Sequence, residues 1–436
     1  MPAINRLDTS TFTSLLSEPS AVIVDARPIA AFNGWRLRGE ARGGHIPSAR
    51  CLPVTWARYM DWVEALDEKG IHRDRHIVVY GYGEEDAGEL ARRLSDIGFE
   101  QVSLYLNFIE DWTEDDSRPL ERLARFSQLV HAHWLSDLLG GRQPDEHDGR
   151  DHVLCHVHFD NYDDYRKGHI PGAIALDTLL LEDETTWNRR TPEELRENLT
   201  RLGIRVDKTV VVYGRFSHPR FEDEHPGRQA GQLGAMRAAA ILLYAGVEDV
   251  RILNGGIAAW KSAGFPIDTD VVEPAPVADF GAEIPGRPEL FIDTPEAKEY
   301  LAAPDALLVS VRSWPEHIGE TSGYHYIEPK GRIPGAVFGN GGSDAYHMEN
   351  YRNFDFTMRT YPEVEAAWKS IGVVPEKRAA FYCGTGWRGS EAFLNAYLMG
   401  WPRVSVYDGG WMEWSADPDN PTETGIPSDE AERGHQ

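Results

Sequence analysis

Three segments of the 436-residue chain repeat the same landmarks in the same order. Each copy begins with an apolar run, continues with a Gly-(His/Arg)-Ile-Pro turn and reaches a second apolar run that stops at a loop. The first runs span residues 22–27, 153–158 and 307–312, the turns begin at 44, 168 and 331, and the second runs span 76–81, 209–214 and 380–383. A repeat of this length predicts three copies of one domain.

The apolar runs are rich in β-branched residues, and a helical pattern follows each second run. Strands that are almost continuously apolar are covered on both faces, and their alternation with helices favours a parallel sheet. We therefore expect an α/β fold of three tandem domains, each a parallel sheet flanked by helices. The sequence Thr191-Pro192-Glu193-Glu194 predicts one helix start, with an N-cap, a proline at N1 and a capping-box glutamate.

The repeat also predicts the domain boundaries. Domain one spans 1–125, domain two spans 126–272, a Pro-rich and extended linker covers 273–288, and domain three spans 289–436. Extra residues stand at 215–229 in the second copy and at 339–360 in the third. Insertions of this kind are candidates for walling a cleft.

Composition excludes several classes of function. The formal net charge of -26 repels phosphates, so we expect no binding to nucleic acid and none to an anionic membrane. No apolar stretch nears the ~20 residues of a membrane span, and no secretory signal is visible. We expect a cytoplasmic protein, or a periplasmic one if its N-terminus has been trimmed.

The chain has three cysteines, Cys51, Cys155 and Cys383. They are too few and too widely spaced for a disulfide framework, and no metal-ligand spacing is present, so we expect neither a metal nor a cofactor. Cys51 and Cys155 stand in apolar surroundings typical of core packing. The tryptophans that close the three copies, Trp112, Trp260 and Trp414, are expected to anchor the cores.

Cys383 differs from the other cysteines because it ends the second apolar run of the third copy. Gly81 and Gly214 occupy its position in the other two copies, which are therefore expected to be inactive. A strand, a Gly-rich loop and a helix together form a cradle of backbone N–H groups for an anion. A cysteine at the first position of such a loop is a candidate nucleophile, since the thiolate is the reactive form.

The loop residues after Cys383 fit this chemistry. Gly384 and Gly386 allow the backbone to curl, Thr385 offers a hydroxyl, and Arg388 adds a fixed positive charge. Trp387 either lines the site or leans on domain two. Four residues separate the cysteine from the arginine, whereas a cysteine phosphatase loop has five, so the shorter loop favours a persulfide sulfur over a phosphoryl group.

These motifs resemble those of the rhodanese family. The resemblance rests on the strand ending in Asp/Ser-x-Arg, the Gly-His-Ile-Pro-x-Ala turn, the Cys383 loop and a closing Gly-Gly-x-x-x-Trp at 255–260 and 409–414. Three copies with one cysteine loop are similar to bacterial three-rhodanese-domain sulfurtransferases of the thiosulfate or molybdopterin-synthase type. The resemblance implies that Cys383 accepts sulfane sulfur as a persulfide and passes it to a thiophilic acceptor, with Gly384, Thr385, Gly386, Trp387 and Arg388 as its cradle.

The resemblance leaves the sulfur donor open. Thiosulfate-using members carry basic residues after the cysteine, and Gly384 and Thr385 are closer to the mercaptopyruvate-using type. Both types have an arginine where this chain has Glu316, so Arg312 is a candidate substrate contact. Donors are thiosulfate, 3-mercaptopyruvate or a protein persulfide, with a cysteine desulfurase as partner; acceptors are cyanide, a thiol or a sulfur-carrier protein. The alternatives are a non-enzymatic binding scaffold and a cysteine phosphatase or arsenate reductase.

Overall fold

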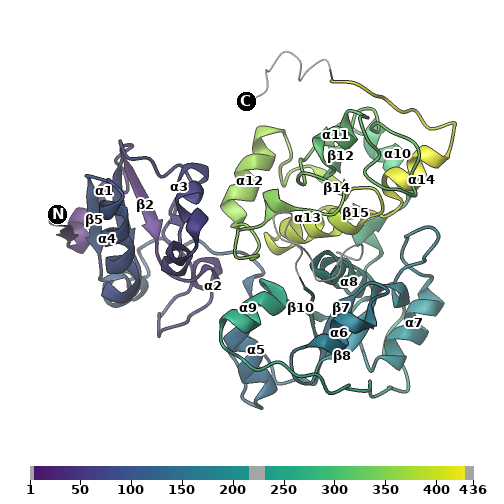
Figure 1. The fold of residues 1–436 in the computed structure, drawn as a ribbon, viewed down its shortest axis with the longest axis horizontal. Coiled ribbons are helices and arrows are strands. Elements are labelled where there is room, and N and C mark those ends of the chain that lie inside the picture. Colours follow the sequence, from purple (N-terminus) through teal and green to yellow (C-terminus); the bar gives the residue numbers. More distant parts are fainter. Residues whose placement is uncertain (1–3, 216–230, 428–436) are drawn as a thin grey trace. The chain divides into compact units, whose positions relative to one another are not determined.

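A computed structural model of the chain describes residues 4–215 and 231–427 (Figure 1). The chain divides into two compact units, residues 1–127 and 128–436. The first unit holds domain one, and the second holds domains two and three. Of the two insertions, residues 216–229 lie outside the described part of the chain, whereas 339–360 are inside it.

Each domain contains one five-stranded parallel sheet among the described residues, which confirms the predicted fold class. The strand orders are β1-β5-β4-β2-β3, β6-β10-β9-β7-β8 and β11-β15-β14-β12-β13. The chain thus builds the same topology three times, and the second apolar run of each copy is the central strand. Consecutive parallel strands need helical crossovers, which supply the covering layers.

Domain one runs through these elements: β1 (Asn5–Leu7), α1 (Thr9–Leu15), β2 (Ala21–Asp25), α2 (Ile29–Asn33), β3 (Arg50–Cys51), α3 (Glu64–Glu68), β4 (His76–Tyr80), α4 (Glu89–Asp96) and β5 (Val102–Tyr105). A short π-helical turn, η3 (Glu84–Gly88), separates β4 from α4. The predicted core anchor Trp112 is buried, and it packs against Phe12 of α1.

Domain two follows the same order: β6 (Leu129–Val130), α5 (Ala132–Leu139), β7 (His152–His158), α6 (Tyr162–Lys167), β8 (Ile174–Asp177), α7 (Pro192–Arg201), β9 (Thr209–Tyr213), α8 (Gly231–Ala245), β10 (Asp249–Leu253) and α9 (Gly256–Ser262). The capping box that the sequence predicts at the start of α7 is confirmed: Thr191 caps the Glu194 N–H, and the Glu194 carboxylate accepts from the Thr191 N–H at 3.0 Å.

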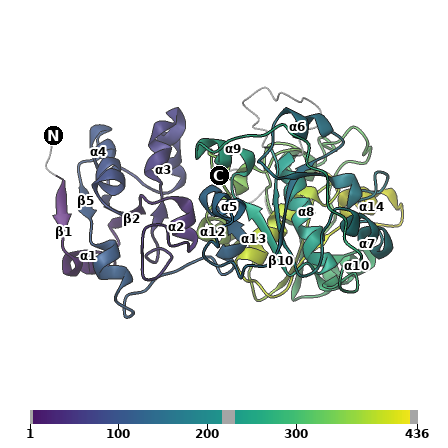
Figure 2. The ribbon, with the colours of Figure 1, turned by 90° about the horizontal axis from the view of Figure 1, so that it is seen from below.

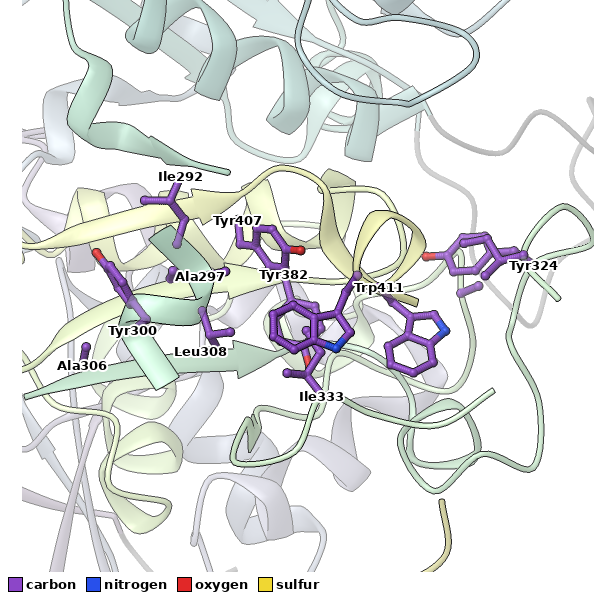
Figure 3. Close-up of a cluster of buried hydrophobic side chains, with 14 residues drawn as sticks. Ile292, Ala297, Tyr300, Ala306, Leu308, Tyr324, Ile333, Tyr382, Tyr407 and Trp411 are labelled. Carbon is purple, nitrogen blue, oxygen red and sulfur yellow. The ribbon is translucent and has the colours of Figure 1, made fainter. Parts of the chain in front are cut away.

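Domain three comprises β11 (Phe291–Ile292), α10 (Thr294–Ala302), β12 (Ala306–Ser310), α11 (Trp314–His317), β13 (Val337–Phe338), α12 (Tyr361–Ser370), β14 (Arg378–Tyr382), α13 (Trp387–Leu398), β15 (Val404–Tyr407) and α14 (Gly410–Ala416). Alternate strand residues point to opposite faces. On one face, Leu308, Tyr382 and Tyr407 form a core with Trp411 and Trp414 of α14 (Figure 3). The other face is covered by α12 and α13 (Figure 1).

Domains two and three pack through α8 and α13, which lie side by side (Figures 1 and 2). Every residue of both helices is buried. A helix that is apolar on all sides is covered on all sides, and the Gly- and Ala-rich sequence of α8 lets α13 approach closely. Buried charges cross this interface: Arg189 of domain two pairs with Asp408 of domain three at 2.8 Å, and Arg237 of α8 pairs with the same carboxylate at 2.6 Å.

Among the described residues, no helix combines the length and the apolar character that crossing a membrane requires.

Candidate active site

Cys383 stands directly after β14, the central strand of the third sheet, and α13 begins four residues later. Its side chain is buried. The carbonyl groups of Cys383 and Gly384 accept hydrogen bonds from the backbone N–H groups of Trp411 and Met412 in α14, at 2.9 and 3.0 Å. Gly386 adopts the left-handed conformation, with φ of 82°, which an L-residue with a side chain rarely adopts. The local sequence thus produces the predicted strand, loop and helix.

The backbone N–H groups of residues 384–388 have no acceptor among the residues that the structure describes. They are the first donors of α13 and of the loop before it, where helix geometry supplies no partner. Buried backbone donors are nearly always paired, so a set of this kind is adapted to an anion held by the loop. A persulfide on Cys383 would place a negatively charged sulfur at this point.

The equivalent loop of domain one is filled by its own carboxylate. Asp86 accepts hydrogen bonds from the N–H groups of Tyr82 and Gly83 at 2.8 Å and from that of Ala87 at 2.7 Å. A Cβ atom added to Gly81 would lie 2.9 to 3.0 Å from the carboxyl atoms of Asp86. The domain therefore lacks the cysteine and also the space for one.

Domain two closes its loop in another way. The N–H of Gly214 donates to the side-chain oxygen of Gln232 at 3.0 Å. A Cβ on Gly214 would lie 2.0 Å from the carbonyl oxygen of Gly231, so the position accepts only glycine. Within the described residues, the loop of domain three alone keeps both a cysteine and unpaired backbone donors.

Two buried arginines and one carboxylate lie beside the active loop. Glu316 accepts from Arg388 at 2.8 and 3.0 Å and from Arg312 at 3.3 Å. Burial favours the neutral acid, but Arg388, followed by Arg312, outweighs it and lowers the pKa of Glu316 to about 2. The three ionised groups carry one net positive charge. Glu316, which stands where the family has an arginine, therefore does not leave the loop in a negative environment.

The two arginines are held by different contacts. The guanidinium of Arg388 binds Glu316, the Tyr324 hydroxyl and the carbonyl of Asp344 in the 339–360 insertion, so this insertion contacts the site as expected. Arg312 is fully buried, and it binds the carbonyl of Gly331 at 2.6 Å and packs over the Trp411 ring. Its contact with substrate stays a prediction.

Tyr324 explains why a glycine follows the cysteine. Its ring lies on the loop, so that a Cβ on Gly384 would meet ring carbons at 2.2 and 2.4 Å. Burial, with the Glu316 carboxylate and the Cys383 thiolate nearby, raises the pKa of Tyr324 well above its usual value. Tyr324 lies at one end of the buried core cluster of domain three (Figure 3), and its ring connects that cluster to Gly384 of the loop.

Six aromatic rings form a continuous surface beside the loop, here named the aromatic wall. Neighbouring ring centroids are 5.3 to 6.1 Å apart. The wall crosses the domain interface twice, because rings of domain two contact rings of domain three. Its members are Phe159 and Trp187 from domain two, and Tyr324, Tyr326, Tyr346 and Trp387 from domain three.

The aromatic wall faces both the reactive loop and solvent. Tyr326 is hydrogen-bonded to Thr385, and the Cys383 thiolate adds to the burial that raises the pKa of Tyr326. Tyr326 and Tyr346 are 36% and 44% exposed, so a solute can reach the rings. Trp187 has a left-handed backbone, with φ of 61°, which is uncommon for a residue with a bulky side chain.

Sequence reasoning missed the aromatic wall except for Trp387. Trp387 contacts domain two, which is one of the two alternatives predicted for it. Its indole packs over Gly234 of α8, and its ring meets that of Phe159 edge-on, with centroids 5.8 Å apart. The other members are spread over 188 residues, and the only local signal among them is the Tyr-His-Tyr run at 324–326. The contacts between domains two and three are what bring them together.

The remaining predicted residues occupy structural positions. Cys51 and Cys155 are buried in β3 and β7, and burial raises the pKa of Cys155 to about 12, so this thiol is inert. Trp260 and Trp414 are buried core residues like Trp112. In residues 4–215 and 231–427, no group of three or more His, Cys, Asp or Glu side chains is arranged to hold a metal ion.

The filled loop of domain one yields a test. We expect Gly81→Cys to add a cysteine that accepts no sulfur, because Asp86 occupies the space and the N–H groups that a persulfide needs. After treatment with a small persulfide, the intact mass of Gly81→Cys should show one added sulfur per chain, on Cys383. The double variant Cys383→Ser/Gly81→Cys is the control and should show no added sulfur. A second sulfur on the single variant would contradict this account of the silent loop.

The contact between Gly384 and Tyr324 yields a second test. Gly384→Ala forces the Tyr324 ring off the loop, and we expect it to lower the free energy of unfolding in urea by about 1–3 kcal/mol, as overpacking does. In a Tyr324→Ala background, the same change should cost far less, because the ring is gone. Equal costs in the two backgrounds would show that the clash is not with Tyr324.

Comparison with known proteins agrees with the fold. The family model described as rhodanese-like domain matches residues 8–115, 132–263 and 293–417. Thiosulfate sulfurtransferase YnjE of Escherichia coli K12 is 40% identical over 416 residues, which cover 94% of this chain and 90% of the relative.

Two solved structures are similar over nearly the whole chain. One is an anaerobic ergothioneine biosynthesis enzyme from Chlorobium limicola in complex with its natural substrate, trimethyl histidine. The other is an EanB variant, with tyrosine replaced by alanine, in complex with ergothioneine covalently linked with a persulfide cysteine. Each is 52% identical, has a TM-score of 0.95, and covers 98% of this chain and 100% of the other. The chain therefore belongs to the rhodanese family of sulfurtransferases, with three tandem rhodanese-like domains.

Proposed function

We propose that the chain transfers the sulfane sulfur of a Cys383 persulfide to the imidazole ring of trimethylated histidine, which yields ergothioneine. The observation that carries this proposal is the aromatic wall beside the Cys383 loop. Electron-rich ring faces attract quaternary ammonium groups, which have no N–H to donate and so cannot form hydrogen-bonded ion pairs. Trimethylated histidine carries such a group, and its imidazole supplies the carbon that accepts sulfur.

The spacing of residues in EanB supports the proposal. EanB variants with threonine replaced by valine or alanine bind hercynine, and the tyrosine variant binds ergothioneine. Tyr324 and Thr385 stand at the same spacings from Cys383 as the varied tyrosine and threonine do from the persulfide cysteine of EanB. In this chain, Tyr324 contacts Gly384 and accepts a hydrogen bond from Arg388. Thr385 is itself a residue of the loop.

The proposed reaction balances without a further oxidant or reductant. The C2–H bond of the imidazole breaks, a C2–S bond forms to the terminal sulfur, and the S–S bond of the persulfide breaks. Cys383 leaves as a thiolate, and the proton from C2 is returned to it, which leaves a free thiol. The unpaired N–H groups of residues 384–388 hold the anionic sulfur before transfer and the thiolate after it.

The source of the sulfur is a separate part of the proposal. Thiosulfate, 3-mercaptopyruvate and a protein persulfide from a cysteine desulfurase remain the candidate donors. The net positive charge of Arg388, Arg312 and Glu316 supports binding of an anionic donor. Loading the protein from each donor in turn and weighing it intact identifies the donor by the gain of one sulfur.

The experiment that tests the proposed acceptor uses protein already loaded with sulfur. Incubation with trimethylated histidine should release ergothioneine and return the protein to its unloaded mass, and Cys383→Ser should release none. Loaded wild type that keeps its sulfur in the presence of trimethylated histidine, yet gives it to cyanide, would contradict the acceptor while leaving the sulfurtransferase assignment in place.

The aromatic wall predicts the specificity. We expect Trp187→Ala to raise KM for trimethylated histidine by about ten-fold or more, the scale of a desolvated cation–π contact. The preference over unmethylated histidine should fall by a similar factor. Tyr162→Ala, which removes an exposed aromatic ring of domain two outside the wall, is the control and should leave both quantities unchanged. Loss of activity without loss of preference would argue against recognition by the wall.

A further inference from the structure

One ion pair in domain two contacts both tryptophans of the aromatic wall. Glu182 accepts a hydrogen bond from the indole N–H of Trp387 at 2.8 Å and another from the guanidinium of Arg237 at 3.1 Å. Arg237 in turn donates to the backbone carbonyl of Trp187 at 2.9 Å. Glu182 and Arg237 are both completely buried. The pair therefore connects the loop of domain three to Trp187 of domain two.

We propose that Glu182 is a positioning residue, which fixes Trp387 through its hydrogen bond and Trp187 through Arg237, and so sets the geometry of the aromatic wall. The proposal rests on the function proposed above. It gives domain two, which lacks a nucleophile, a direct part in binding the acceptor.

The surroundings of Arg237 support this role. Asp408, which begins the turn before α14, pairs with Arg237 at 2.6 Å and holds the guanidinium from the side of domain three. A Cβ added to Gly386 would lie 3.0 Å from the Nη1 atom of Arg237, so the guanidinium sits directly against the reactive loop. A buried ion pair contributes little net stability, but it can fix one arrangement of the groups around it.

The charge of Glu182 changes near neutral pH. Burial raises the pKa of Glu182 to about 7, against the opposing effect of Arg237. The charged and titratable groups that face it are Arg237, Arg189 (whose backbone pairs with it), Tyr326 and, beyond Arg237, Asp408. The pKa values of both arginines and of Tyr326 are raised, and Arg237 and Arg189 outweigh burial to lower that of Asp408, so near pH 7 the arginines stay cationic, Asp408 stays anionic and Tyr326 stays neutral.

The sign of the pH effect follows from these directions. Glu182 is anionic above pH 7 and neutral below it. Both hydrogen bonds go to Oε2, which leaves Oε1 to take the proton. Neutral Glu182 still accepts these bonds, but they lose their charge assistance, so Trp387 and Trp187 are held less firmly. Acceptor binding should therefore weaken as the pH falls through about 7. Folding stability has the opposite dependence, because the pKa of Glu182 is ~4.3 in the unfolded chain and about 7 in the folded one. The stability that comes from burying the neutral acid is lost as the pH rises through this window.

Tryptophan fluorescence tests the positioning without any substrate. In the wild type we expect a spectral change with a midpoint near pH 7. The change should be absent in Glu182→Gln, which cannot ionise, and present in Glu184→Gln, an exposed neighbour in the same loop. Circular dichroism verifies that each variant is folded. The same transition in Glu182→Gln would overturn the proposal.

Kinetics with trimethylated histidine test the link to the wall. Glu182→Gln should raise KM at pH 8 by about ten-fold, with a smaller change in kcat, and should remove the pH dependence of KM, because a charge-assisted bond is lost. Trp387→Phe keeps the ring and lacks the N–H, and combining it with Glu182→Gln should add little to the effect of Glu182→Gln on KM. Fully additive effects would overturn the proposal. If the wild type does not turn over this substrate, the proposed acceptor fails, and the fluorescence titration decides the positioning role by itself.

Discussion

Backbone donors at the start of a helix need an acceptor, and this constraint distinguishes the three domains. Each domain ends its central strand in a loop whose N–H groups must be paired. Domain one supplies Asp86, and domain two supplies Gln232 to Gly214. Among the described residues, domain three supplies no acceptor to residues 384–388 and has a cysteine at the head of the loop. Among the described residues, side chains accept from the loops of domains one and two, whereas an anionic sulfur on Cys383 would supply the acceptor that residues 384–388 lack.

Domain two supplies side chains that lie beside the Cys383 loop. It provides two rings of the aromatic wall, Phe159 and Trp187, and packs α8 along α13. Its buried charges, Glu182, Arg189 and Arg237, meet the loop and Asp408 of domain three. In the proposed function, recognition of the acceptor uses rings from both domains. Domain two would then take part in substrate binding although it has no cysteine at position 214.

The features of the fold that depend on local sequence pattern could be predicted from the sequence. The repeat predicted three parallel sheets, and the position of Cys383 after the central strand followed from the alignment of the three copies. The acceptor could not be predicted, because Trp187 and Tyr326 meet only through the packing of domains two and three. The environment of Glu316 was predicted in part. The sequence suggests that Arg388 could offset an acid at this position, but the contribution of Arg312 is seen only in the folded structure.

The central claim is that the sulfur held on Cys383 is the sulfur that reaches the imidazole ring. The most direct measurement is a single turnover with protein that carries isotopically heavy sulfur on Cys383, freed of donor and then mixed with trimethylated histidine in excess. The account predicts one heavy sulfur in ergothioneine for each loaded chain and a protein mass that returns to that of the free thiol. Ergothioneine without the label, or label that stays on the protein, would contradict it.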